Sequence, residues 1–274
     1  MSTPPRALTI AGSDSGGGAG LQADLRTFFA CGVHGMSAVT AVTVQNSLRV
    51  SAVHEIPADV VAAQIETVAT DIGVDAAKTG MLAGAAIVEA VAEACRRVHI
   101  GQHGRSPLVV DPVAASMHGD QLLREDALDA LRHTLFPMAT LITPNLDEVR
   151  LLTGIEVRDR AGQYAAAAAL LEFGPRWVLV KGGHLHDDPL CLDLLTDGTE
   201  HIELTGPRLA VTDTHGSGDT MASAITSALA HGSELQDAVR HGKRFVSRSV
   251  AAAYPLGAGT GPVSPLWRLS TETV

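Results

Sequence analysis

Short apolar runs that alternate with amphipathic segments of helical length constrain the fold of this chain more than any other feature of its sequence. Runs of this kind, bounded by polar or glycine-containing turns, are typical of strands buried on both faces. The predicted strands cover residues 7–11, 38–44, 76–79, 108–110, 140–142 and 177–180. Helical periodicity predicts helices over residues 21–30, 58–72, 85–98, 125–135, 147–152, 161–173, 220–230 and 234–253. This alternation indicates an α/β fold with a mostly parallel central sheet, helices on both faces and right-handed crossovers.

The later part of the chain departs from strict alternation. Two further apolar runs, Leu190–Leu195 and His201–Leu204, flank the dipeptide Asp197-Gly198, which is a strong hairpin signal. We therefore expect a small antiparallel edge on the sheet. No linker, low-complexity tract or internal repeat interrupts the chain, so we expect residues 1–274 to form a single domain.

Composition argues against several classes of function. Hydrophobic residues make up 46% of the 274 residues and aromatic residues only 3%, so we expect a core of small aliphatic side chains. The net charge is −10, with 20 basic and 30 acidic residues and no cluster of lysine and arginine, which argues against a nucleic-acid partner or an anionic membrane. The 3 cysteines are scattered, and there is neither an apolar signal segment nor an apolar run long enough to span a bilayer. We therefore expect a cytoplasmic protein.

One segment in the last third of the chain has the composition of an anion-binding site. Residues 213–220 read Asp-Thr-His-Gly-Ser-Gly-Asp-Thr and precede a helical run. Glycines allow backbone N–H groups to converge on one point, and the start of a helix adds the positive end of its dipole. Asp219 lies inside the segment as a base beside the expected phosphate, which suggests phosphoryl transfer to a hydroxyl group. An ordinary helix N-cap uses the same residue types, so the segment alone leaves both interpretations open.

Polar or glycine-rich segments follow the predicted parallel strands at the point where each strand ends. These segments are Gly12–Gly20, Gln45–Asn46, Lys78–Met81, Asp111, Asn145–Glu148 and Lys181–His184. The carboxyl ends of parallel strands meet at one edge of an open sheet, where ligands bind. This convergence predicts a small-molecule site at that edge, independently of residues 213–220.

The glycine run at residues 12–20 favours a small-molecule pocket over a dinucleotide site. Its glycines lack the spacing G-x-G-x-x-G, and the second strand ends in Val44-Gln45-Asn46 instead of an acidic residue that would bind a ribose. A phosphate loop of the form G-x-x-x-x-G-K-[ST] is also absent from the sequence. Asp24 lies one turn into the predicted helix that follows the run. We expect this loop to shape a pocket.

Other positions at the same edge have both a functional and a structural interpretation. The amide of Gln45 suits the edge of a heteroaromatic ring, but it also suits a hydrogen bond to loop backbone. Asn145 and Glu148 have the spacing of a capping box, and they also offer oxygen ligands for a hydrated Mg²⁺ ion. Lys181 directly follows a buried strand, where it could neutralise a transferred phosphate, although most lysines are simply solvated. Spacing alone leaves these alternatives open.

Taken in order, the segments resemble the hydroxymethylpyrimidine/phosphomethylpyrimidine kinases of thiamine biosynthesis, which belong to the ribokinase-like superfamily. The resemblance runs from about residue 6 to about residue 269. It rests on Ala-Gly-Ser-Asp-Ser-Gly-Gly-Gly-Ala-Gly-Leu-Gln-Ala-Asp at 11–24, Val-Gln-Asn at 44–46, Lys-Thr-Gly-Met-Leu at 78–82, Val-Asp-Pro-Val at 110–113, Thr-Pro-Asn-Leu-Asp-Glu at 143–148, Lys-Gly-Gly-His at 181–184 and His-Gly-Ser-Gly-Asp-Thr at 215–220. It implies a ribokinase-like fold and ATP- and Mg²⁺-dependent phosphorylation of 4-amino-5-hydroxymethyl-2-methylpyrimidine, then of its monophosphate to the diphosphate.

The resemblance also implies roles for particular residues. Gln45 is expected to contact the pyrimidine edge, in a pocket lined by Gly12, Asp24, Val44 and Met81. On the phosphate side, Asn145 and Glu148 are expected to organise the ATP phosphates and Mg²⁺, through water, with Lys181 near the transferred group. The implied anion hole is formed by Gly216, Ser217 and Gly218, with Asp219 as the base. The resemblance further implies a homodimer.

Asp219 departs from the family pattern, since members often carry cysteine there, whereas aspartate is usual in the wider sugar-kinase superfamily. A carboxylate is a suitable base for a hydroxymethyl group. The second acceptor is a phosphate dianion, which needs no base and is repelled by a carboxylate, so the second step is the one that Asp219 puts in question. The alternatives are a pyridoxal kinase of the same superfamily, a sugar or nucleoside kinase, and a sensor without activity. The joint presence of Asp219, Lys181 and Glu148 argues against the sensor.

Overall fold

The computed structural model describes residues 3–114, 123–183 and 190–268, so His184 of the 181–184 segment lies outside the described residues. Its centre is a nine-stranded sheet in the order β3-β2-β1-β4-β5-β6-β7-β8-β9. The strands are β1 (Arg6–Ser13), β2 (His34–Gln45), β3 (Val50–Glu55), β4 (Ala76–Thr79), β5 (Leu108–Val110), β6 (Leu141–Ile142), β7 (Val178–Val180), β8 (Asp193–Thr196) and β9 (His201–Leu204).

The parallel part of the sheet creates a crevice at its carboxyl edge. Strands β2, β1, β4, β5, β6 and β7 pair in parallel, with Ala7 of β1 opposite Gly35 of β2 on one side and Ala76 of β4 on the other. The chain passes from β1 to β2 in one direction and later returns to β4 on the opposite side of β1. This reversal makes β1 and β4 the topological switch point, which is where open α/β sheets bind ligands.

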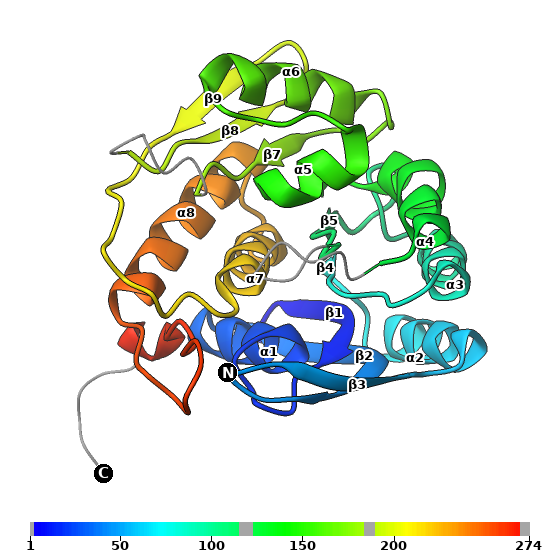
Figure 1. Cartoon of the computed structure of the whole chain (residues 1–274). Helices are drawn as coiled ribbons and strands as arrows, with labels where there is room; N and C mark the ends of the chain where they lie inside the picture. The colour runs from blue at the N-terminus through cyan, green and yellow to red at the C-terminus, as the bar shows by residue number, and fades with distance from the viewer. Residues whose placement is uncertain (1–2, 115–122, 184–189, 269–274) are drawn as a thin grey trace.

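Helices cover both faces of the sheet, as the sequence predicts (Figure 1). One face carries α1 (Gly20–Ala30), α7 (Ser217–Ala230) and α8 (Leu235–Ala251), which pack against one another. The other face carries α2 (Ala58–Asp71), α3 (Ala85–Arg97), α4 (Glu125–Ala130), α5 (Leu146–Thr153) and α6 (Arg160–Leu171). Within the described residues, no helix is both long and apolar enough to cross a membrane.

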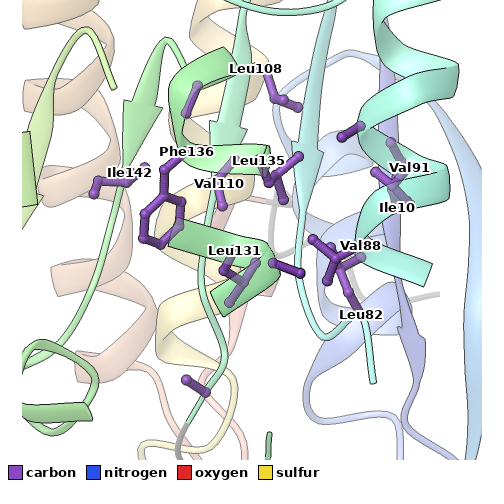
Figure 2. Close-up of a cluster of buried hydrophobic side chains, with 14 of the residues drawn as sticks. Ile10, Leu82, Val88, Val91, Leu108, Val110, Leu131, Leu135, Phe136 and Ile142 are labelled. Carbon is purple, nitrogen blue, oxygen red and sulfur yellow. The ribbon is translucent and has the colours of Figure 1, made fainter. Parts of the chain in front are cut away.

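The central strands have buried side chains on both faces, which explains their continuous apolar runs. In β5, Leu108 and Val110 lie in the larger cluster beneath α3 and α4, shown in Figure 2, together with Leu135. Val109, between them, lies in a second cluster beneath α7 and α8 with Leu179 of β7. Alternation of side chains along a strand places neighbours on opposite faces, so a strand covered on both sides needs apolar residues throughout.

Both edges of the sheet are antiparallel, whereas the sequence predicts only one. Strands β8 and β9 form the expected hairpin around Asp197, with Gly198 at a φ of 92°. At the opposite edge β3 pairs antiparallel with β2, and all of its residues are exposed. The helix expected over residues 125–135 also differs, because α4 ends at Ala130 and continues as a π-helical turn, Leu131–Leu135.

Candidate active site

The segment predicted to form an anion hole lies at the start of α7. Gly216 is the N-cap at a φ of 76°, and Thr220 N donates to Gly216 O in the first helical hydrogen bond. The amides of Gly218 and Asp219 precede that bond, so they are outside the helical ladder and available to an anion. A Cβ on Gly216 would overlap the carbonyl oxygen of Gly18, so the two glycine segments lie in direct contact. Glycine is therefore required at 216 by both its φ and its surroundings.

The glycine run after β1 is organised by a residue that the sequence analysis did not select. The buried carboxylate of Asp14 accepts hydrogen bonds from the amides of Gly16, Gly18 and Ala19, and it lies 3.1 Å from Nε2 of His215. Burial alone would raise the pKa of Asp14, but the hydrogen bonds from His215 and from backbone outweigh it and lower the pKa. An aspartate that begins a glycine-rich turn is a signal for this type of loop.

Asp219 lies in the first turn of α7, with 13% of its side chain exposed. Its Oδ1 atom is 3.5 Å from Nζ of Lys78, a fully buried lysine at the end of β4. Lys78 was noted in the sequence only as part of a strand end. The structure therefore adds a buried cation next to the expected base.

The expectation that the Asp24 side chain lines the pocket is wrong. Asp24 has no exposed surface, and its carboxylate accepts hydrogen bonds from Lys78 at 2.8 Å and from the hydroxyl groups of Thr9 and Ser223 at 2.6 Å each. A buried lysine requires a nearby carboxylate, and Asp24 supplies it from α1. The partner is distant in sequence, so spacing within the first helix could not reveal the pair.

Lys181 extends the site along the sheet edge. Its Nζ lies 2.9 Å from Oδ1 of Asp111, which also accepts a hydrogen bond from Thr143 at 2.9 Å. A Cβ on Gly218 would lie 3.4 Å from Lys181 Nζ and 3.4 Å from Asp111 Oδ2, so this pair is adjacent to the anion hole. Burial alone would lower the pKa of Lys181, but Asp111 and Glu148 outweigh it and raise the pKa. Lys181 is therefore a positive charge beside the anion hole.

Asn145 and Glu148 form the capping box of α5. The Asn145 side chain accepts from the Glu148 amide at 2.9 Å, and the Glu148 side chain accepts from the Asn145 amide at 2.8 Å and from the Ala114 amide at 3.2 Å. Burial raises the pKa of Glu148 to about 7, against the effect of Lys181, and the nearby carboxylate of Asp111 raises it further. The capping-box interpretation of Asn145 and Glu148 is therefore confirmed. The same two side chains are also the candidates for the magnesium site.

The acidic residues near α5 fit a hydrated magnesium ion. Asp111 and Glu148 are buried carboxylates, and of the two lysines at this edge only Lys181 is in contact with Asp111. Carboxylate oxygens are the ligands that Mg²⁺ prefers, and the ion commonly keeps several waters. Within the described ranges no group of three or more His, Cys, Asp and Glu side chains is close enough to enclose a metal. The residues therefore fit a metal held partly through water and phosphate.

On the acceptor side, the structure brings Gly12 and Met81 together. A Cβ on Gly12 would lie 2.7 Å from Cε of Met81, so a side chain there would displace the end of the Met81 side chain. Gln45 ends β2, with its Nε2 atom 3.4 Å from Nε2 of His215, and Thr43 donates to its Oε1 at 3.2 Å. Val44 is also at the end of β2 and is 60% exposed. The sequence leaves two alternatives for the Gln45 amide, a free group facing a ring and a group bonded to loop backbone. In the structure the amide instead contacts the side chains of Thr43 and His215.

A cavity of about 580 Å³ opens next to the anion hole, between the sheet edge and α8. Polar groups of Lys181, Ser217 and Gly218 line it together with the apolar side chains of Val211 and Val246. This lining suits a ligand with an anionic chain and an apolar ring. A carboxylate in the first turn of a helix, free helix amides and such a cavity beside the carboxyl edge of an α/β sheet are the features expected of a small-molecule kinase with a ribokinase-like fold.

Comparison with known families agrees with this class. The model of the phosphomethylpyrimidine kinase family matches residues 14–264, and the chain belongs to that family. A hydroxymethylpyrimidine/phosphomethylpyrimidine kinase from Mycobacterium tuberculosis is 62% identical over 268 residues, which cover 98% of this chain and 96% of the relative.

Solved structures confirm the fold. An ADP complex of Bacillus subtilis pyridoxal kinase superimposes with a TM-score of 0.89 at 35% identity and covers 98% of this chain and 100% of that one. A phosphomethylpyrimidine kinase from Clostridium difficile 630 gives a TM-score of 0.78 at 38% identity, covering 89% of this chain and 99% of that one. The resemblance stated from the sequence is therefore confirmed at the level of family and fold.

Proposed function

We propose that this chain uses ATP to phosphorylate 4-amino-5-hydroxymethyl-2-methylpyrimidine and then its monophosphate, giving the diphosphate used in thiamine diphosphate biosynthesis. The observation that carries the proposal is the position of Asp219, a carboxylate in the first turn of α7 beside free helix amides and a buried lysine. The 62% identity to the mycobacterial relative supports the substrate class.

In this mechanism Asp219 accepts the proton of the hydroxymethyl group while its oxygen attacks the γ-phosphorus of ATP, and the bond to the β-phosphate oxygen breaks to release ADP. The free amides at the start of α7, those of Gly218 and Asp219, and the ammonium of Lys181 hold the charge of the transferred group, while the Ser217 amide donates to Thr214 O at 3.1 Å. Each well-placed donor contributes roughly 3–4 kcal/mol, as oxyanion-hole donors do. Gln45, Gly12, Val44 and Met81 hold the pyrimidine.

Mg²⁺ would be held by Glu148 and Asn145, partly through water, with Asp111 alongside. When bound, the ion supplies charge neutralisation on the ATP phosphates. The protein's own contribution is a fixed cluster of oxygen atoms, since Glu148 is held by two backbone amides and Asp111 by Thr143 and Lys181.

The test is ADP formation with ATP and Mg²⁺, with the free pyrimidine alcohol, its monophosphate and pyridoxal offered separately. We expect turnover of both pyrimidines. Asp219→Asn should lower kcat for the alcohol by about 10²–10⁴-fold, the usual contribution of a general base, and should affect the monophosphate less because that acceptor needs no base. Equal losses on both pyrimidines would remove Asp219 from the role of base, and absence of any turnover would favour the sensor.

Pyridoxal phosphorylation is the second candidate function, because the B. subtilis structure with a TM-score of 0.89 is a pyridoxal kinase. Pyridoxal also carries a hydroxymethyl group on a nitrogen heteroaromatic ring, so the same base and anion hole serve it. A kcat/KM for pyridoxal above that for both pyrimidines would replace the first proposal with this one.

We also propose that the protein is a cytoplasmic homodimer that uses the β2–β3 hairpin as its interface. The hairpin exposes apolar side chains that a second copy would cover, namely Val42, Leu48, Val50 and Val53, which are 45–59% exposed. Such a cluster on an open sheet edge is typical of an association surface. Light scattering should give a dimer for the wild type and a monomer for Val53→Lys, and a monomeric wild type would contradict the proposal.

A further inference from the structure

Lys78 is a buried charge that the mechanism above does not use. It lies at the end of β4, and its side chain has no exposed surface. Burial of an ammonium group is costly, so a buried lysine persists only where acceptors surround it. The arrangement of those acceptors therefore indicates what the lysine is for.

Asp24 is one of the acceptors, and it is already well supplied with donors. Its Oδ1 atom accepts hydrogen bonds from Lys78 at 2.8 Å and from Ser223 at 2.6 Å, while Oδ2 accepts from Thr9 at 2.6 Å. Both oxygens of Asp24 thus have a hydroxyl donor of their own. An ion pair that served stability alone would require no second acid near Lys78.

The second acid beside Lys78 is Asp219, with Oδ1 at 3.5 Å from Nζ. Gly80 lies beside the pair, since a Cβ there would be 3.4 Å from Lys78 Nζ and 3.8 Å from Asp219 Oδ1, and 3.0 Å from Cβ of Ala11. Asp219 is 13% exposed and Lys78 is not exposed, so the carboxylate reaches from the buried lysine to the open side of the site. Lys78 is therefore behind the base, on the side away from the substrate.

The charges around this pair support a protonated lysine. Burial alone would lower the pKa of Lys78, but Asp24, Asp219 and Asp111 outweigh it and raise the pKa. Lys181, on the far side of Asp111, also interacts with Asp219. Lys78 is therefore a fixed positive charge that contacts the buried side of the Asp219 carboxylate.

We propose that Lys78 is a positioning residue for phosphoryl transfer, which holds the Asp219 carboxylate in the orientation that accepts the substrate proton. The inference rests on the proposed role of Asp219 as the base. Because Lys78 is fully buried, it does not touch the substrate, and its influence on the reaction passes through Asp219. A positioning role therefore predicts that loss of Lys78 affects the reaction only while Asp219 is present, whereas a purely stabilising role predicts no such dependence on Asp219.

The test is a cycle of variants in which the Lys78–Asp24 pair is replaced by neutral side chains of similar size. Lys78→Met with Asp24→Asn removes one positive and one negative charge, so neither partner is left buried and unpaired. The kcat for the pyrimidine alcohol is measured in this double variant, in Asp219→Asn and in the triple variant. Circular dichroism and thermal unfolding report whether each variant is folded.

We expect kcat to fall at least about tenfold in the double variant, and the triple variant to be no slower than Asp219→Asn, because residues that act as a unit are not additive. Wild-type kcat in the double variant would overturn the inference, and so would a loss that multiplies with that of Asp219→Asn. Wild-type kcat in Asp219→Asn itself would instead overturn the proposed function, and this inference with it.

Gly80→Ala is the second variant, for use if the double variant does not fold. It adds a methyl group that contacts both Lys78 and Asp219 and presses on Cβ of Ala11 at 3.0 Å, so it disturbs the pair without changing any charge. If Lys78 positions the base, Gly80→Ala should lower kcat for the alcohol severalfold in the wild-type background and leave the residual activity of Asp219→Asn unchanged. An equal loss in both backgrounds would show a steric effect on the substrate and overturn the inference.

Discussion

At the scale of residues, the carboxyl edge of the sheet repeats one arrangement, a lysine between two acids, and the lysine is fully buried at Lys78 and 14% exposed at Lys181. Lys78 lies between the carboxylates of Asp24 and Asp219, and Lys181 interacts with those of Asp111 and Glu148. Carboxylates outnumber lysines in this cluster, although the ligand proposed to bind there is an anion. In the proposed mechanism, the start of α7 and a divalent cation would supply the positive charge that the side chains lack.

Glu148 should make the stability of the metal-free protein depend on pH. Burial raises the pKa of Glu148 to about 7, above its ordinary value of 4.5. Between these values the folded state binds more protons than the unfolded state, so the free energy of unfolding falls as the pH rises from 5 to 8, by roughly 1–3 kcal/mol. Denaturant unfolding in EDTA should show this fall in the wild type and a smaller one in Glu148→Gln. An equal pH dependence in the two proteins would contradict it.

Gly216 should be needed for ATP binding beyond its backbone conformation. Gly216 and Gly232 both have positive φ, 76° and 85°, but only at Gly216 would a Cβ overlap other atoms, those of Gly18. The positive φ makes alanine cost roughly 1 kcal/mol of stability at either position, and the overlap with Gly18 adds to that cost at Gly216. Gly216→Ala should in addition weaken ATP binding at least tenfold in calorimetry, because the two glycine segments must separate. Gly232→Ala is the matched control, and an equal effect of the two variants on binding would contradict this account.

At the scale of elements, the sequence predicts the strands that are buried on both faces of the sheet and misses the exposed edge strand β3. Strands β4 and β5 have the predicted bounds, and every residue in them is buried, including Lys78 and Thr79 of β4. Strand β3 has no buried residue, so no hydrophobic period marks it, and it exists through its hydrogen bonds to β2. Such pairing depends on tertiary structure and leaves no local pattern.

Replacing the N-cap residue of α5 should affect both stability and ATP binding, whereas replacing that of α6 should affect stability alone. Asn145 caps α5 beside the anion-binding cavity, and Asp159 caps α6 by accepting from the Gly162 amide at 2.8 Å. Replacement of either by alanine should lower the free energy of unfolding by about 1 kcal/mol. Only Asn145→Ala should also raise the KM for MgATP. Equal KM values in the two variants would leave Asn145 with its capping role alone.

At the scale of the whole molecule, the sequence locates the site at one sheet edge but not the partners within it. Asp14 meets His215, and Lys78 meets Asp24, across long stretches of chain. Each of these contacts depends on the fold as a whole. Motif spacing therefore suggested that Asp24 lines the pocket, and it could not show that the Asp24 side chain is buried against a lysine.

We expect the chain to unfold as one domain. The two hydrophobic clusters share the same strands, since Val109 belongs to one and its neighbours Leu108 and Val110 to the other. Scanning calorimetry should give one transition whose calorimetric and van't Hoff enthalpies agree. MgATP at 100 times its Kd should stabilise that transition by about 2.7 kcal/mol. Two transitions, only one of which responds to MgATP, would contradict a single domain.

The position of α7 and α8 late in the sequence has a consequence for how the protein is made. During synthesis every parallel strand leaves the ribosome before the helices that cover the second cluster, so Val109, Leu141 and Leu179 have no cover until residues 217–251 emerge. The same late segment carries the anion hole and Asp219. The nascent chain is therefore most prone to aggregate just before it becomes able to act, and catalytic activity appears only when the sheet is protected on both sides.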